Sequence, residues 1–219
     1  MKIFLDTANI ELIKKWAHTG LIDGVTTNPT HLSKENTNPT EQVLAICDIL
    51  PLGVISAEIT ETDPEAVYVQ ARKIAALSDN IAVKIPCHSD YYHIIKKLVE
   101  EDVSLNITLV FSLVQGLMMA KLGVDYISPF VGRLDDIGAD GSALVRQLRH
   151  MLDWYGFETQ LLAASIRDTH HLEQAIMAGA DIATVPGTVF EQSLAHQLTD
   201  KGMAQFLADW KKLNIAHFP

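Results

Sequence analysis

The sequence predicts an α/β protein, a single (β/α)8 TIM barrel with an additional C-terminal helix. Short apolar or β-branched runs alternate with longer stretches of helical spacing, which is the pattern of successive βα units around a parallel sheet. The alternation continues along the chain of 219 residues, a length that such barrels commonly reach as one domain. We therefore expect one barrel domain over residues 1–219.

The expected strands number eight. A doubly wound open sheet would give similar local patterns. When such a sheet binds a dinucleotide, it carries Gly-x-Gly-x-x-Gly after its first strand, whereas Asp6-Thr7-Ala8-Asn9 contains no glycine, and the chain has no Walker loop. These features favour the closed barrel, with strands at residues 2–6, 24–28, 54–59, 81–86, 104–110, 125–130, 159–165 and 182–186.

The helices between the strands have recognisable beginnings, faces and ends. Asp63-Pro64 supplies an N-cap and a proline at the first helical position, and Gly123, Gly156 and Gly179 mark helix ends. After the eighth strand, residues 201–213 predict one further amphipathic helix with no strand behind it. The predicted apolar faces are Val67, Ala71, Ile74 and Ala75; Tyr91, Ile94, Ile95 and Leu98; Leu144, Leu148, Met151 and Leu152; and, in the last helix, Met203, Phe206, Leu207 and Trp210.

Composition excludes several classes of function. The chain has 17 basic and 27 acidic residues, a net charge of −10, and no polycationic run, so nucleic acid is not an expected partner. Asp6 precedes any signal-peptide apolar core and no apolar stretch reaches membrane-spanning length, which predicts a cytoplasmic protein without a membrane partner. Cys47, Cys87 and the adjacent His170-His171 lack metal-site spacing, so we expect no metal and no cofactor.

Polar residues gather near the C-terminal ends of seven of these strands. In a barrel those ends converge on one mouth, where catalytic groups are placed. The candidate site residues from these ends and the loops behind them are Asp6, Thr26, Asn28, Glu58, Lys84, Asn106, Thr108, Ser128, Arg133, Ser165 and Arg167.

Lys84 is the most informative of them because it lies in the apolar run 81–86. A buried lysine is paired, snorkelling or functional, and a closed barrel has no sheet edge for it to protect. Desolvation favours the neutral amine, which attacks a ketone to form a Schiff base. A structural ion pair explains the residue equally well at this point. Asp6 and Glu58 are candidate general acids or bases, and either is also a candidate counter-ion for Lys84.

Arg133 and Arg167, together with Ser165, predict a phosphate site. Guanidinium groups bind phosphate oxygens in a fixed fork and stay charged. Solvated surface arginines are the alternative. On an acidic chain, two arginines in the loops after the sixth and seventh strands would create a positive mouth for an anionic substrate.

Several motifs resemble the transaldolase family, and the resemblance covers essentially the whole chain. The short length is similar to that of the small transaldolases grouped with fructose-6-phosphate aldolase. The motifs are Phe4-Leu5-Asp6-Thr7-Ala8, Gly24-Val25-Thr26-Thr27-Asn28-Pro29, Val83-Lys84-Ile85-Pro86, Asn106-Ile107-Thr108-Leu109-Val110-Phe111-Ser112 and Ser128-Pro129-Phe130-Val131-Gly132-Arg133.

The resemblance implies a Schiff-base mechanism of the pentose phosphate pathway that needs no metal or cofactor. Lys84 would attack the C2 carbonyl of a ketose phosphate, fructose 6-phosphate or sedoheptulose 7-phosphate, and Asp6 would take the C4 hydroxyl proton so that an aldose phosphate leaves. A second aldose phosphate would accept the dihydroxyacetone unit. Glu58 and Thr108 match the family's water-mediated proton relay. Thr26, Asn28, Asn106, Ser128 and Phe130 match its substrate-binding positions, and Arg133, Ser165 and Arg167 match its phosphate site.

Two positions separate transfer from simple aldol cleavage within this resemblance. The chain carries Glu58 and Phe130, as transaldolases do, where the aldolase has Gln and Tyr. One departure is Gly187-Thr188, where close relatives would carry a bulkier apolar residue and a lysine. Fructose-6-phosphate aldolase is the alternative function, and a non-catalytic sugar-phosphate-binding barrel is a third. The terminal helix and the short family members imply a homo-oligomer, with a decamer as the form they suggest.

Overall fold

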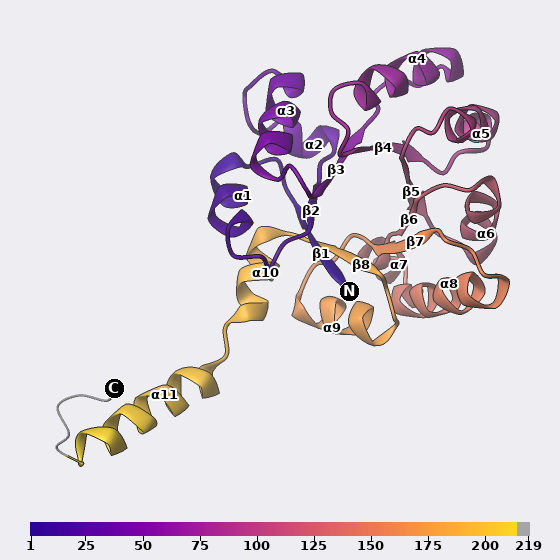
Figure 1. The fold of residues 1–219 in the computed structure, drawn as a ribbon. Coiled ribbons are helices and arrows are strands. Elements are labelled where there is room, and N and C mark those ends of the chain that lie inside the picture. The colour runs from indigo at the N-terminus through magenta and orange to yellow at the C-terminus, as the bar shows by residue number, and fades with distance from the viewer. Residues whose placement is uncertain (214–219) are drawn as a thin grey trace.

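The computed structural model describes residues 1–213 and confirms the predicted (β/α)8 barrel (Figure 1). Each strand pairs in parallel with the next, and β8 pairs with β1 to close the sheet. The strands are β1 (Lys2–Asp6), β2 (Gly24–Thr26), β3 (Val54–Glu58), β4 (Ile81–Pro86), β5 (Leu105–Val110), β6 (Tyr126–Pro129), β7 (Gln160–Ala163) and β8 (Ile182–Val185).

The helices surround this sheet and begin and end on the expected signals. The Asp63 side chain accepts a hydrogen bond from the backbone N–H of Ala66, and Gly123 and Gly156 end their helices in the left-handed conformation. The helices are α1 (Ile10–Ala17), α2 (Pro29–Leu32), α3 (Pro39–Ile49), α4 (Pro64–Ala75), the 3-10 turn η1 (Ser89–Tyr91), α5 (Tyr92–Glu100), α6 (Leu113–Leu122), α7 (Val131–Asp135), α8 (Gly141–Tyr155), α9 (Thr169–Met177), α10 (Gly187–Leu194) and α11 (Gln197–Lys211).

Five strands end earlier than predicted: β3 and β8 by one residue each, and β2, β6 and β7 at points that leave residues of the mouth outside the strands. β2 ends at Thr26 because Asn28 caps α2, its side-chain oxygen accepting a hydrogen bond from the backbone N–H of His31. β6 ends at Pro129, so that Phe130 is the residue before α7. β7 ends at Ala163, and Ser165 beyond it has a φ of 60°, which a strand cannot accommodate.

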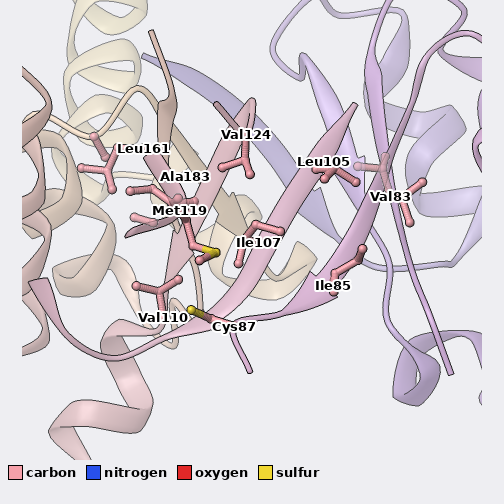
Figure 2. Packing of buried hydrophobic residues seen from close by; sticks show 14 of the residues in the cluster. Val83, Ile85, Cys87, Leu105, Ile107, Val110, Met119, Val124, Leu161 and Ala183 are labelled. Carbon is pink, nitrogen blue, oxygen red and sulfur yellow. The ribbon is translucent and has the colours of Figure 1, made fainter. Parts of the chain in front are cut away.

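The main hydrophobic core lies between the sheet and the helices. Figure 2 shows part of it, with side chains from β4, β5 and β8 together with Met119 of α6. Because strand side chains alternate between the two faces, each strand sends one set of residues into this core and the other set into the barrel. The outer set is apolar in every strand, which explains why the predicted strands read as apolar runs.

A second, smaller core fills the N-terminal half of the barrel interior. Its buried members include Phe4, Ala82, Leu162 and Ile182. Gly24 makes room for this packing, because a Cβ there would lie 2.7 Å from the Phe4 ring and 2.4 Å from the Val54 carbonyl oxygen. The lower interior is therefore a packed apolar plug, and the cavity described below lies above it.

The C-terminal part of the chain contains Gly187, which departs from the family pattern, and a helix with an exposed apolar face. A Cβ at Gly187 would lie 2.3 Å from Leu12 Cδ2, so the glycine makes room for packing against α1. The helix predicted at 201–213 is α11, which begins four residues earlier at Gln197 and extends away from the barrel (Figure 1). Its Phe206 is exposed.

The expected single domain of residues 1–219 also includes 214–219, which lie outside the described residues. None of the helices within residues 1–213 has the length and apolar character needed to cross a membrane.

Candidate active site

Barrel geometry brings the predicted site residues to one level above the plug. In the sheet register Asp6 pairs with Thr26, and Lys84 lies between Glu58 and Asn106. Since these residues occupy inward-facing positions near the strand ends, their side chains meet at the C-terminal mouth. The result is a ring of polar groups on an apolar floor.

A cavity of about 160 Å³ opens at this level. All but three of the predicted site residues line it. The exceptions are Glu58, Thr108 and Arg167, which are described below. The lining residues are Asp6, Thr26, Asn28, Lys84, Asn106, Ser128, Phe130, Arg133, Leu162, Ala164, Ser165 and Thr184.

Lys84 is 5% exposed and carries an ion pair at the edge of the cavity. Its Nζ lies 3.1 Å from Glu58 Oε2 and 3.4 Å from the carbonyl oxygen of Thr27. The ion pair, one of the two roles predicted for this lysine, is thus present. It does not exclude the other role, because Glu58 is also close enough to take a proton from the ammonium and leave a free amine.

Asp6 is held by two partners on one oxygen. Thr26 Oγ1 donates to Asp6 Oδ1 over 2.9 Å, and His31 Nε2 lies 3.3 Å from the same oxygen. Burial raises the pKa of Asp6, but the hydrogen bond and charge of His31 act in the opposite direction and are supported by Lys84 and Thr26. The net effect lowers the pKa below the usual value. Asp6 is therefore kept as a carboxylate, the form that accepts protons.

Thr108 is buried, and within residues 1–213 its hydroxyl has no hydrogen-bond partner. The strand bends beside it: Leu109 has a φ of 56°, and the β5–β6 register shifts between Ile107 and Val110. Bulges of this kind re-aim side chains next to active sites. A buried hydroxyl without a protein partner is suited to hold a water molecule. This fits the proton-relay role that the family resemblance implies for Thr108.

A buried chain of hydrogen bonds fixes the amide at the back of the cavity. Ser128 Oγ donates to Asn106 Oδ1 over 2.6 Å, and Asn106 Nδ2 donates to Ser56 Oγ over 3.0 Å. All three residues are at most 1% exposed. The chain orients both the amide and the Ser128 hydroxyl beside Lys84, whose strand neighbours that of Asn106.

The arginines occupy the outer rim. The Arg133 guanidinium lies 5.1 Å from the centre of the Phe130 ring, a cation–π contact that keeps it over the cavity. Arg167 does not line the cavity: its two terminal guanidinium nitrogens bind the carboxylate of Asp136, and this contact lowers the pKa of that carboxyl group. Gly132 allows the close approach, because a Cβ there would lie 2.7 Å from Arg167 Nε.

Sequence reasoning missed three residues at the mouth. Thr184 lies on β8 and lines the cavity, and alternation within the eighth predicted strand would have found it. Asp136 is the partner of Arg167, a pairing across 31 positions that no local pattern reveals. His31 contacts Asp6 from α2, and nothing in the sequence points to it. Within residues 1–213 no group of three or more His, Cys, Asp or Glu side chains could hold a metal ion.

This fold and cavity define a class, that of TIM-barrel enzymes with their polar groups at the carboxyl ends of the strands. Residues 3–216 match the family described as Transaldolase/Fructose-6-phosphate aldolase. The chain belongs to this family.

Similar proteins match along nearly their full length. The chain is 51% identical to a probable transaldolase of Lactiplantibacillus plantarum, over 96% of this chain and 97% of that protein. It is 50% identical to a probable transaldolase of Dehalococcoides mccartyi, over 97% and 99% of the two chains. A probable transaldolase of Parabacteroides distasonis is 47% identical over 98% of this chain and its own full length. The prediction of a transaldolase is confirmed by these relatives.

Proposed function

We propose that this transaldolase moves a dihydroxyacetone unit from a ketose phosphate to an aldose phosphate through a Schiff base on Lys84. The observation that carries the proposal is the placement of Lys84, buried at the cavity beside Glu58 and with Asp6 on the same cavity wall. A site that only bound sugar phosphates would need the arginines, but it would give no reason to bury a lysine next to carboxylates.

The first step forms the imine. Glu58 takes a proton from the Lys84 ammonium, and the free amine attacks C2 of fructose 6-phosphate or sedoheptulose 7-phosphate. The carbinolamine hydroxyl then leaves as water after receiving a proton. Glu58 supplies that proton through a water held by Thr108, whose hydroxyl has no protein partner within residues 1–213. The product is a protonated imine, an electron sink adjacent to C3.

The second step breaks the carbon chain. Asp6 takes the proton of the C4 hydroxyl, C4 becomes a carbonyl, and the C3–C4 bonding pair moves toward the imine to give an enamine. The shorter aldose phosphate departs. A different aldose phosphate enters, the enamine carbon attacks its aldehyde, and Asp6 returns the proton to the new hydroxyl. Hydrolysis of the imine by the reverse of the first step then frees the product and Lys84.

The rest of the lining binds the sugar. Asn28, Asn106, Ser128 and Thr26 present hydroxyl and amide groups at the cavity wall. Arg133, Ser165 and Arg167 bind the phosphate, and for Arg167 this requires exchanging the Asp136 carboxylate for phosphate oxygens. A carboxylate and a phosphate can both bind the guanidinium fork through two parallel hydrogen bonds, which supports the assignment of Arg167 to an anion site.

Release of free dihydroxyacetone is the second candidate activity, because the family also includes fructose-6-phosphate aldolases. Glu58 and Phe130 favour transfer over release. The Phe130 ring borders the cavity and has no hydroxyl to position water at the imine. Assays with and without an acceptor aldose phosphate separate the two activities.

We also propose that the enzyme is a cytoplasmic homo-oligomer, with a decamer as the expected form. The helix α11 extends from the barrel and exposes Met203, Phe206 and Leu207, an apolar surface that a second copy would cover. Both cysteines are free thiols, which suits a reducing compartment. Light scattering during size-exclusion chromatography measures the mass, and a monomer at assay concentration would contradict the oligomer.

Borohydride trapping tests the central proposal. The enzyme is incubated with fructose 6-phosphate and sodium borohydride, digested and analysed by mass spectrometry. We expect the peptide with Lys84 to gain the mass of a reduced sugar adduct, with the three-carbon dihydroxyacetone unit as its main form. Labelling of a different lysine would contradict the assignment. Binding of the sugar phosphate without any adduct would favour the non-catalytic barrel.

A further inference from the structure

His31 lies outside the cavity lining but touches the residue proposed to move the substrate proton. It belongs to the short helix α2, which begins directly behind Asn28. The Asn28 side chain accepts from the backbone N–H of His31 over 2.9 Å, so the position of the residue on the mouth is fixed through its backbone. The imidazole then reaches Asp6, with 3.3 Å between His31 Nε2 and Asp6 Oδ1.

Both partners of Asp6 contact the same one of its two carboxylate oxygens. Thr26 and His31 both contact Oδ1, and within residues 1–213 Oδ2 takes part in no hydrogen bond or ion pair. The Thr26 hydroxyl is itself fixed. Its single proton goes to Asp6, so in the 2.5 Å contact with Thr184 it is Thr184 that donates. A carboxylate held at one oxygen from two directions cannot rotate freely, and its other oxygen is left to accept a proton.

We propose that His31 is a positioning residue for this reaction: its imidazole fixes the Asp6 carboxylate through Oδ1 and so directs Oδ2 to the substrate hydroxyl. The inference rests on the proposed function, since it assigns the proton transfer to Asp6. His31 touches neither the cavity nor the reacting atoms, and it acts through the carboxylate alone.

A packing role of the side chain can be separated from this positioning role. The side chain is 24% exposed and so partly buried, which means that a test substitution has to keep its volume. The helix cap uses the backbone N–H of the residue, which every substitution except proline preserves. Replacing the imidazole therefore removes the contact to Asp6 and leaves the cap in place.

The electrostatic consequence has a definite sign. In the described part of the chain, the charged or titratable groups that face Asp6 are His31 from α2 and Lys84 from β4, and Lys84 is balanced by Glu58 from β3. His31 lowers the pKa of Asp6. Without His31 this pKa rises, so the reactive carboxylate is lost at a higher pH as the solution is acidified. The acid limb of the pH–rate profile must then move to higher pH.

The experiment compares wild-type enzyme with His31→Leu, which is close in volume and has no ring N–H, and with His31→Gln, which keeps an amide N–H donor. For His31→Leu we expect kcat to fall about tenfold, the loss of one hydrogen bond to a charged group, with KM changed less than about twofold. We also expect the acid limb to move to higher pH. His31→Gln should recover most of kcat. His93→Leu, the same change at an exposed position of α5, serves as the matched control.

Trapped adducts give the decisive measurement. Asp6 acts after the imine has formed, so slower bond cleavage should enrich the uncleaved six-carbon adduct on Lys84 over the three-carbon one in His31→Leu. A folded His31→Leu enzyme with the wild-type acid limb and the wild-type adduct ratio overturns the inference. His31→Met provides the same loss of the ring donor if the leucine variant is insoluble. Failure of the proposed function is distinguished from this outcome, because wild-type enzyme itself would then form no adduct.

Discussion

The two ends of the cavity are built on different principles. At the inner end Lys84 and its neighbours stand on strands, are buried, and are held by hydrogen bonds within the sheet. At the outer rim Arg167 is 47% exposed on a loop and is paired with the carboxylate of Asp136. The proposed function uses the inner end in the arrangement seen here, whereas it requires Arg167 at the rim to exchange Asp136 for phosphate.

This difference suits the inner end to the proposed bond making and the rim to the proposed recognition of the substrate. Buried groups on rigid strands keep the geometry that bond formation requires, so their side chains need little rearrangement during the reaction. In the proposed function, the arginine bound to Asp136 selects against ligands that cannot replace a carboxylate, because a neutral sugar has no anionic group to bind it. Substitutions at the inner end should therefore lower kcat, and substitutions at the rim should raise KM.

Replacing Lys84 should have the largest effect. In Lys84→Ala the nucleophile is absent, and we expect kcat for transfer to fall at least about a thousandfold, together with complete loss of borohydride trapping. Steady-state kinetics and intact-protein mass measure both. Lys201→Ala, an exposed change on α11, should behave as wild type. Undiminished turnover of a folded Lys84→Ala enzyme would remove the distinction between the two ends.

Replacing the rim arginines should have an intermediate effect of a different kind. For Arg133→Ala and Arg167→Ala we expect KM for fructose 6-phosphate to rise about 10- to 100-fold, the loss of one charge-assisted pair, with Lys84 still trappable. Kinetics with non-phosphorylated fructose provide the comparison, since that donor should be affected little. Equal losses of kcat/KM for both donors would show that the arginines do not recognise phosphate.

Phe130 should give the smallest effect, because it lines the same cavity as Lys84 and contacts Arg133 of the rim but carries no polar group of its own. In Phe130→Tyr a hydroxyl is placed near the imine, where it can position water, so free dihydroxyacetone should form a few-fold faster from fructose 6-phosphate alone and transfer should weaken. Measuring both products gives the ratio of release to transfer. If that ratio is unchanged in a folded variant, Phe130 only packs the mouth.

The sequence predicts the inner end better than the rim, for a physical reason. β1 and β4 have the predicted bounds because a short apolar run marks each of them, and a lysine within the run of β4 is conspicuous. The barrel then brings strand ends together without further information. The rim depends on contacts between loops, such as Arg167 with Asp136, and on single backbone conformations such as the positive φ of Ser165. No periodic pattern in the sequence predicts the loop contact or the backbone conformation.

His31 is a further residue whose place at the site could not be predicted from the sequence. Its contact with Asp6 depends on how α2 turns after β2, and that turn follows from the Asn28 cap and the proline behind it. Asn28 and Pro29 suit an N-cap and a first helical position, which the predicted strand 24–28 overlooked, and they do not specify which later side chain returns to the mouth. Thr184, in contrast, follows from alternation along β8.

The apolar plug beneath the cavity has a consequence for the order of events. Phe4, Leu162 and Ile182 are at most 1% exposed, so within residues 1–213 apolar side chains close the barrel beneath the cavity, which opens at the C-terminal mouth. In the proposed reaction, the aldose phosphate released from the donor and the aldose phosphate that accepts the carbon unit therefore pass through the same opening in turn. Because the two cannot occupy the cavity together, the proposal predicts ping-pong kinetics, with the first product competing with the acceptor.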